Sequence, residues 1–151
     1  MTITIFQAER KHLDQVTPLF DAYRRFYRQP SDEARARAFL QARLDNQDSL
    51  ILMALDEASS RGVGFTQLYP AFSSVRTQPI WILNDLFVVP EARGRGVGRQ
   101  LMDAARRAAE QAGVAALTLA TEKNNATAKA LYASLGYTLD GAFDYYELSL
   151  R

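Results

Sequence analysis

The chain has 151 residues, of which 48% are hydrophobic and 23% charged, the proportions of an ordinary soluble globular protein. Its net charge of +1 provides no field for nucleic acid or an anionic membrane, and the absence of cysteine excludes disulfides, thiolate nucleophiles and cysteine–metal sites. The single histidine, His12, excludes a histidine metal cluster, and no apolar run approaches the ~20 residues of a membrane span. The N-terminal residues lack the pattern of a signal peptide, so we expect a cytoplasmic protein. The length of the chain predicts a single domain, residues 1–151.

The first half of the chain alternates between strand and helix patterns. Apolar residues recur at strand spacing over 2–7, 49–55 and 63–69 and at helix spacing over 11–28 and 32–44. The first helix should end before Pro30, because the residue before a proline avoids the helical region. Ser31 offers a side-chain cap to the second helix. Residues 70–79 are polar and begin and end with proline, which predicts a loop.

The second half begins with the longest apolar strand, residues 80–89, which Pro90 closes. A helical pattern follows over 97–111, and Gly113 should end it. The apolar segment 114–120 predicts a strand buried on both faces. Asn125 should cap a helix that runs to about residue 135, with two short strands after it around Tyr137 and Tyr145. These elements indicate an α/β or α+β fold without repeats or linkers.

A glycine- and arginine-rich segment, residues 93–99, connects the long strand to the following helix. The first amides of a helix lack internal partners, and the helix dipole makes that end positive, which suits an anion. Gly94, Gly96 and Gly98 permit positive φ and let a phosphate approach the backbone. The arginines of the segment add charge that suits phosphate oxygens. A flexible basic turn is the alternative reading of this segment.

Two common phosphate-binding motifs do not match. A Walker loop ends in glycine, lysine and serine or threonine, whereas Gly98 is followed by arginine and glutamine. A dinucleotide fingerprint has the spacing G-x-G-x-x-G in an early βαβ unit, whereas this segment reads G-x-G-x-G and lies late in the chain.

The segment does match another family. Residues 93–98, RGRGVG, fit the Q/R-x-x-G-x-G/A signature of the GCN5-related N-acetyltransferase (GNAT) superfamily. The segment NATAKALYASLGY resembles the second signature of that family, whose places are filled by Asn125, Ala128, Leu131, Tyr132, Gly136 and Tyr137. The order of the elements agrees along essentially the whole chain. The resemblance is weakly closer to the branch of polyamine and histone acetyltransferases.

The resemblance implies a mixed central sheet with two splayed parallel strands, flanked by about four helices. It implies acetyl-CoA as co-substrate and transfer of the acetyl group to a primary amine of a small molecule or peptide, by direct attack in a ternary complex. The residues that it implies for coenzyme A are Phe87, Val88, Val89, Arg93, Gly94, Arg95, Gly96, Val97, Gly98, Arg99, Asn125 and Tyr132. The first three are expected to act through their backbone amides and carbonyls, and Tyr132 also as the general acid for the leaving thiolate.

The base that deprotonates the amine is less closely defined. Asp85 is the first candidate, although it also suits a role in holding a loop or binding substrate, and Glu122 is the alternative. Strand alternation places Asp85 and Asn84 on opposite faces. Related polyamine acetyltransferases have an acidic residue at the place of Asn84. Tyr23 and Tyr27 are candidate substrate contacts with Asn84, unless they pack against the sheet.

Two other functions remain as alternatives, a non-catalytic acyl-CoA-binding regulatory module and a protein N-acetyltransferase. We expect no nucleic-acid or membrane partner. The apolar and aromatic segment 143–150, FDYYELSL, predicts an edge strand that needs a cover, and therefore a homodimer.

Overall fold

The computed structural model describes all residues, 1–151, and their contacts divide the chain into two units, residues 1–119 and 120–151. The first unit contains a five-stranded sheet in the order β1-β2-β3-β4-β5. Its strands are β1 (Ile3–Gln7), β2 (Leu50–Asp56), β3 (Arg61–Ser73), β4 (Gln78–Val88) and β5 (Leu117–Leu119). Strands β1 to β4 pair antiparallel, and β4 pairs with β5 in parallel. This mixed sheet confirms the fold class expected from the sequence.

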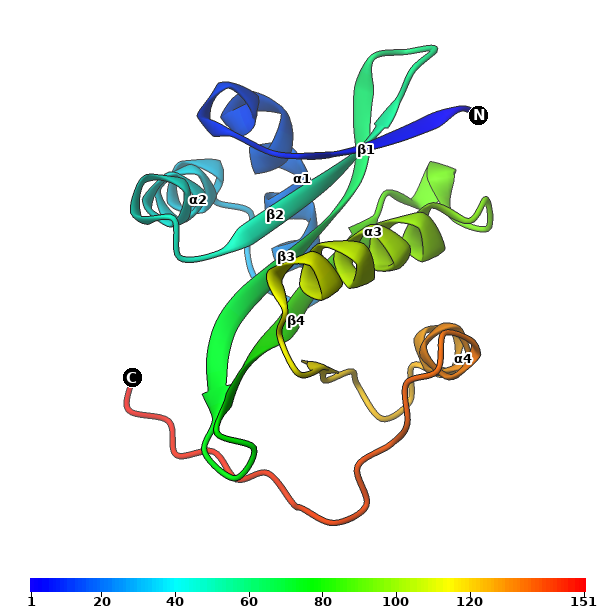
Figure 1. Cartoon of the computed structure of the whole chain (residues 1–151). Coiled ribbons are helices and arrows are strands. Elements are labelled where there is room, and N and C mark those ends of the chain that lie inside the picture. Colours follow the sequence, from blue (N-terminus) through cyan, green and yellow to red (C-terminus); the bar gives the residue numbers. More distant parts are fainter. The chain divides into compact units, whose positions relative to one another are not determined.

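Helices cover both faces of this sheet (Figure 1). Helices α1 (Leu13–Phe26) and α2 (Glu33–Asn46) lie on one face, and α3 (Val97–Ala112) lies on the other. Short 3-10 turns, Arg10–His12 and Pro90–Ala92, precede α1 and α3. Phe65 of β3 is fully buried under α1, where its ring contacts the rings of Phe20 and Tyr23 at centroid distances of 6.0 and 5.7 Å. None of the helices has the length and apolar character that crossing a membrane requires.

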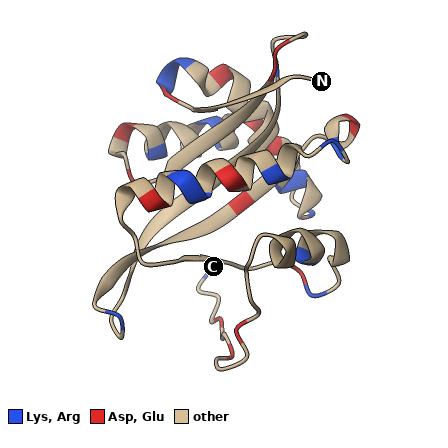
Figure 2. Cartoon of the chain, turned by 45° about the vertical axis from the view of Figure 1, so that its right-hand side comes forward, with Lys and Arg blue, Asp and Glu red and all other residues tan.

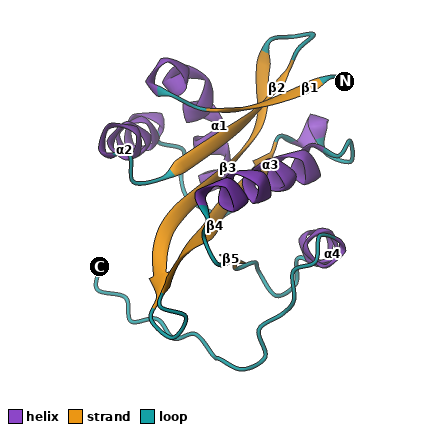
Figure 3. Cartoon of the chain, viewed as in Figure 1, coloured by secondary structure: helices purple, strands orange, loops and turns teal.

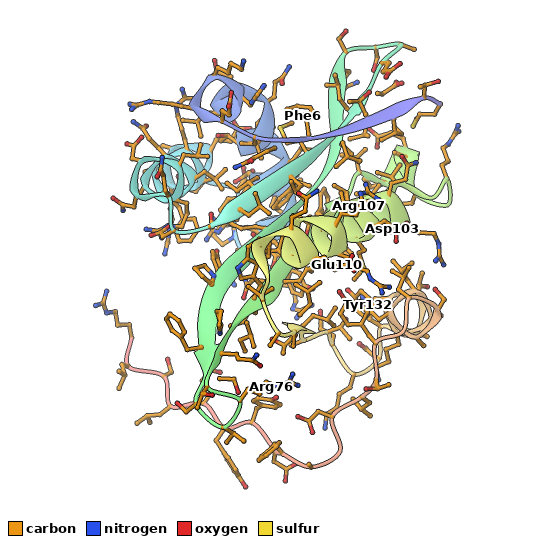
Figure 4. The ribbon with its side chains drawn as sticks, in the orientation of Figure 1. Phe6, Arg76, Asp103, Arg107, Glu110 and Tyr132 are labelled. Atoms are coloured by element: carbon orange, nitrogen blue, oxygen red, sulfur yellow. The ribbon has the colours of Figure 1, made fainter.

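Helix α3 is amphipathic along its length. The residues that it buries recur at helical spacing and are Val97, Leu101, Met102, Ala105 and Ala109. Charged residues of both signs alternate along the opposite side (Figure 2), and Asp103, Arg107 and Glu110 point away from the sheet (Figure 4). This pattern explains why the helix appears clearly in the sequence. Gly113 ends it in a left-handed conformation with φ of 73°, as expected.

The connection between α1 and α2 differs from the sequence expectation. Asp32, and not Ser31, caps α2, because the Asp32 carboxylate accepts a hydrogen bond from the Arg35 amide at 3.0 Å. The Ser31 hydroxyl instead donates to Asp21 at 2.7 Å, and the Asp32 amide donates to the same carboxylate at 2.8 Å. Asp21 is 2% exposed, and a buried carboxylate requires such donors. The predicted cap residue is therefore used to hold α1 against the loop.

The loop expected over residues 70–79 is mostly strand. Pro70 lies opposite Trp81, and Phe72 lies opposite Pro79, so β3 and β4 form one long hairpin with a turn at 74–77. The pairing of β3 with β2 stops at Leu68. Beyond that point the outer edge of β3 has no ladder partner, so the missing N–H of a proline costs no hydrogen bond there.

The C-terminal unit contains α4 (Ala126–Ser134). The Asn125 side chain caps this helix by accepting from the Ala128 amide at 3.1 Å, and Gly136 follows it with φ of 92°, both as expected. The strands expected around Tyr137 and Tyr145 are not formed, because no ladder hydrogen bonds pair these residues with another strand (Figure 3). The edge strand from which a homodimer was expected is therefore absent. The strand expected over 114–120 is also shorter, since β5 contains only Leu117–Leu119.

Gly64 allows close packing between β3, β4 and α3. A Cβ atom at this position would lie 2.8 Å from the Phe87 carbonyl oxygen and 3.2 Å from Cδ1 of Leu101. The backbone oxygen has no room to move away, so we expect Gly64→Ala to lower the free energy of unfolding by about 1–3 kcal/mol. Urea unfolding checks this, with Gly141→Ala as the control, because a Cβ there meets nothing within 4 Å. Equal stabilities of the two variants would contradict the packing argument.

Candidate active site

The glycine loop before α3 has the backbone that the sequence predicts at two of its three glycines. Gly94 and Gly96 have φ of 75° and 79°, and a Cβ atom at either position would meet nothing within 4 Å. Gly98 differs, because it lies within α3 and is not among the residues with positive φ. The backbone conformation therefore favours glycine at the first two positions, whereas the helical backbone at Gly98 does not require it.

The start of α3 leaves its first amides without a side-chain cap. Gly96 is the N-cap residue and has no side chain to offer, and the first backbone bond closes from the Gln100 amide to the Gly96 carbonyl at 3.0 Å. The amides of Val97 and Gly98 in the first turn therefore have no carbonyl partner within the helix. Together with the exposed Arg95, they form a positive, open turn that fits a phosphate group.

Arg93 has a different position from the other arginines of the loop. Its Nε donates to the Val88 carbonyl at 2.8 Å, and its guanidinium lies over the rings of Phe26 and Phe87 at 5.7 and 5.6 Å. These contacts connect the loop to the end of β4 and to α1. The sequence motif cannot distinguish such an anchoring arginine from one that faces a phosphate.

The carboxyl half of β4 pairs with β3 alone. Pairing with β5 ends at Leu83, whereas pairing with β3 continues to Val88. The Val89 amide donates to the Val63 carbonyl at 2.9 Å, so by antiparallel alternation the backbone groups of Phe87 also face β3. The groups of Leu86 and Val88 face the other edge. Of the three residues predicted to offer their backbone to the cofactor, Val88 has its groups on this edge, and Leu86, which the sequence analysis did not name, shares the edge because of the pairing register.

A β-bulge changes the expected arrangement of Asn84 and Asp85. Asp85 lies opposite Gln67 and Leu83 lies opposite Leu68, so Asn84 is an extra residue in β4. Strict alternation therefore fails at this point. The two side chains are in contact, because Asn84 Nδ2 donates to Asp85 Oδ1 at 2.7 Å. The expectation that they face opposite sides was wrong.

Asp85 is a buried carboxylate in a chain of polar side chains. It is 1% exposed, and Gln67 Nε2 donates to its Oδ2 at 2.7 Å. Ser49 in turn donates to Gln67 Oε1 at 2.9 Å. Burial raises the pKa of Asp85, and the hydrogen bonds from Asn84, Gln67 and Tyr23 offset this only in part. A raised pKa makes the carboxylate a better proton acceptor than an ordinary surface aspartate.

Asp85 and Asn84 lie at a cavity of about 330 Å³ between the sheet and helices α1 and α2. The cavity is lined by Phe20, Tyr23, Arg24, Arg35, Ala36, Phe39, Tyr69, Asn84 and Asp85. The Tyr23 hydroxyl donates to the Asn84 carbonyl at 3.3 Å. Burial and the charge of Asp85 raise the pKa values of Tyr23 and Tyr69, so both hydroxyls remain protonated. Tyr27 does not line the cavity, and its ring packs edge-on against that of Tyr23 at 5.1 Å.

The remaining predicted residues belong to the C-terminal unit. Tyr132 lies near the end of α4, with its ring 6.1 Å from that of Tyr137. The Tyr137 amide donates to the Tyr132 carbonyl at 3.0 Å, which fixes the turn after the helix. The Glu122 carbonyl accepts from the Asn125 amide at 3.0 Å. Within this unit, the second signature therefore forms a capped helix followed by a glycine turn.

Comparisons with known proteins agree with these features. The acetyltransferase (GNAT) family model matches residues 16–137. The chain is 49% identical over 148 residues to the uncharacterized N-acetyltransferase YhfO of Bacillus subtilis, with 98% of each chain covered. It is also similar to the crystal structure of a probable acetyltransferase, with a TM-score of 0.92, 38% identity and 98% of each chain covered. An aminoglycoside N-acetyltransferase, AAC(6')-Iy, in complex with CoA has the same fold, with a TM-score of 0.80 at 20% identity over 97% of this chain and 95% of that one. The chain therefore belongs to the acetyltransferase (GNAT) family of N-acetyltransferase enzymes.

Proposed function

We propose that this enzyme transfers the acetyl group of acetyl-CoA to a primary amine of a small molecule or peptide, by direct attack in a ternary complex. The observation that carries the proposal is Asp85, a buried carboxylate with a raised pKa at the floor of a cavity next to the carboxyl half of β4. A cavity with few, convergent polar groups and a perturbed carboxylate is the usual form of a small-molecule active site.

The residues of the glycine loop fit the pyrophosphate of coenzyme A. Gly94 and Gly96 leave open space beside the backbone, and the first turn of α3, which no side chain caps, lies at the positive end of a helix dipole. Arg95 and Arg99 would add charge around the phosphates. The outward-facing backbone groups of Leu86 and the outward amide of Val88 would pair with the pantetheine arm in the manner of an added strand, while the Val88 carbonyl accepts from Arg93. Bound acetyl-CoA supplies an activated acyl group, and no covalent enzyme intermediate is required.

The amine must lose a proton before it can attack, because an alkylamine with a pKa near ~10.4 is mostly protonated at pH 7. Asp85 would accept this proton, directly or through a water molecule. The new C–N bond forms as the C–S bond breaks, and an outward amide of β4 would stabilise the negative charge that develops on the carbonyl oxygen. Tyr132 would donate a proton to the leaving thiolate, which makes coenzyme A the second product.

Steady-state turnover tests the proposal. The protein is incubated with acetyl-CoA and a panel of primary amines, and released thiol is measured. We expect acetyl-CoA-dependent thiol release that requires an amine. Saturable binding of acetyl-CoA without turnover of any amine would contradict the enzyme mechanism and support a non-catalytic acyl-CoA-binding module.

The glycine loop provides a test of the coenzyme A site. We expect Gly96→Val to raise the KM for acetyl-CoA by ~10-fold or more, because the added side chain occupies the space through which a phosphate reaches the amides. The variant is also strained, since Gly96 has φ of 79°. Gly113→Val is the matched control: it has φ of 73°, similar open space, and lies at the other end of α3. An equal KM for the two variants, with equal loss of stability, would contradict the assignment.

A further inference from the structure

The cavity next to Asp85 contains two arginines as well as a carboxylate. Arg24 comes from α1 and Arg35 from α2, so both lie on the helical walls, whereas Asp85 comes from β4 on the floor. The cavity therefore presents positive and negative groups from different elements. A primary ammonium group alone would find one favourable partner there and two charges of its own sign.

Arg24 has a donor that the protein does not satisfy. Its Nη1 atom is buried and has no hydrogen-bond partner. Buried donors without a partner are rare in native proteins, so each one requires an explanation such as a catalytic role or a bound water or ion. The donor belongs to a guanidinium group, whose positive charge and planar fork favour an anionic acceptor such as a carboxylate.

The nearby carboxylates are already engaged with other groups. Asp21 accepts hydrogen bonds from the Ser31 hydroxyl and the Asp32 amide, and it pairs with Arg25 Nε at 3.5 Å. The two oxygens of Asp85 accept from Asn84 and Gln67. Arg24 Nη1 bonds to neither of these acids. Arg24 interacts with Asp21 through charge alone, and because Arg24 lines the cavity, a molecule bound there can supply an acceptor for this donor.

We infer that the acceptor amine carries a carboxylate, and that this carboxylate binds Arg24 and Arg35 while the amine faces Asp85. The inference rests on the proposed acetyltransferase function and specifies its substrate class. The rings of Phe20 and Phe39 stack at 5.5 Å with an interplanar angle of 4° and provide an apolar wall for the rest of the molecule. The volume of about 330 Å³ is near the lower end for ligand sites, which suits a single amino acid or a compound of similar size.

Matched acceptors test the carboxylate. The full protein is assayed with acetyl-CoA and one of four acceptors. These are L-phenylalanine, D-phenylalanine, phenylalaninamide, and phenethylamine, which lacks the carboxyl group. We expect kcat/KM for one phenylalanine enantiomer to exceed the values for the two analogues without a carboxylate by about tenfold or more, because these analogues offer no anionic partner to the buried arginine. Phenethylamine turned over as well as phenylalanine would overturn the inference. A higher kcat/KM for the aminophosphonate analogue of phenylalanine than for phenylalanine would overturn the inference and show that the two arginines prefer a phosphate-like group.

Variants of the two arginines test the site. We expect Arg24→Gln to lower kcat/KM for phenylalanine by about tenfold or more, mainly through KM, with little change for phenethylamine. Arg25→Gln is the matched control, since Arg25 lies next in α1 but does not line the cavity. Arg35→Gln provides a second variant if Arg24→Gln does not fold, because Arg35 is exposed. Equal losses for both acceptors would overturn the inference.

Failure of the inference is distinguishable from failure of the proposed function. If amines are acetylated but those that carry a carboxylate are not preferred, the inference is contradicted and the proposed function is not. If no amine is acetylated, the proposed function fails, and titration calorimetry with phenylalanine and phenethylamine still tests the arginines. Binding of phenylalanine that Arg24→Gln weakens would support the carboxylate site, and absence of binding to the native protein would overturn it.

Discussion

Asp85→Asn is expected to lower kcat/KM for the acceptor amine by ~10²-fold or more, while the stability of the protein at pH 7 stays the same or rises. The loss of activity follows because the amide cannot accept the proton of the amine. A merely structural role for Asp85 predicts the opposite pattern, a loss of stability with activity retained. Kinetics and thermal unfolding of the same preparation separate the two.

The buried polar chain around Asp85 can adapt to asparagine. Asn84 can continue to donate to the side-chain oxygen at position 85, and Gln67 can turn its amide over so that its oxygen accepts from the new amide. The Ser49 hydroxyl, which now donates to Gln67, can then accept instead. Each of these three contacts is retained in the exchange, so the substitution removes a charge without breaking the network.

The pH dependence follows from the direction of the pKa shift. Burial raises the pKa of Asp85 above its unfolded value, so its contribution to stability is complete below the unfolded pKa and is lost as the pH rises through the folded pKa. Above the folded pKa the ionised, buried group therefore costs stability, and Asp85→Asn removes this cost. The native kcat/KM should fall as the pH drops below the raised pKa, and the variant should lack this acidic limb. Asp103→Asn, on the outward side of α3, is the control.

Tyr132→Phe is expected to lower kcat by ~10- to 10³-fold with small changes in the KM for acetyl-CoA and in stability. The substitution keeps the ring, which lies 6.1 Å from that of Tyr137, and removes the hydroxyl proton. A thiol with a pKa near ~8.5 leaves more easily when a proton donor is close, so the effect should appear in kcat. Single-turnover kinetics measure the chemical step directly.

The control for this variant is Tyr145→Phe, which removes a hydroxyl from the exposed segment after α4. We expect it to turn over at the native rate. If Tyr132→Phe reacts as fast as the native enzyme in single turnover, another group or water protonates the thiolate. Tyr132 would then be one of the residues that pack around α4.

The features that the sequence identified correctly depend on short stretches of chain. The two signatures, the helix that Asn125 caps and the one that Gly113 ends, and the positive φ at Gly94 and Gly96 all follow from residues within a few positions of one another. Capping, helical periodicity and the freedom of glycine act over that range, so a single sequence suffices to predict them. The sequence analysis also named Asp85, and its role as the base stays a prediction.

The features that the sequence did not show depend on pairing between distant segments. The bulge at Asn84 arises from the register between β3 and β4, and it turns the Asn84 side chain toward Asp85 instead of away from it. The outward groups of Leu86, and the strand that replaced the loop at 70–79, follow from the same register. Alternation along one strand contains no information about an extra residue opposite another strand.

The walls of the cavity were hidden for a similar reason. Arg24 and Arg35 lie on two helices whose exposed arginines look alike in the sequence, and nothing local distinguishes Arg24 from Arg25. Packing of α1 and α2 on the sheet turns one of them into a cavity with a buried, unpaired donor and leaves the other beside Asp21. Burial is a property of the assembled fold, because the atoms that exclude water from a side chain come from elements far away in the sequence.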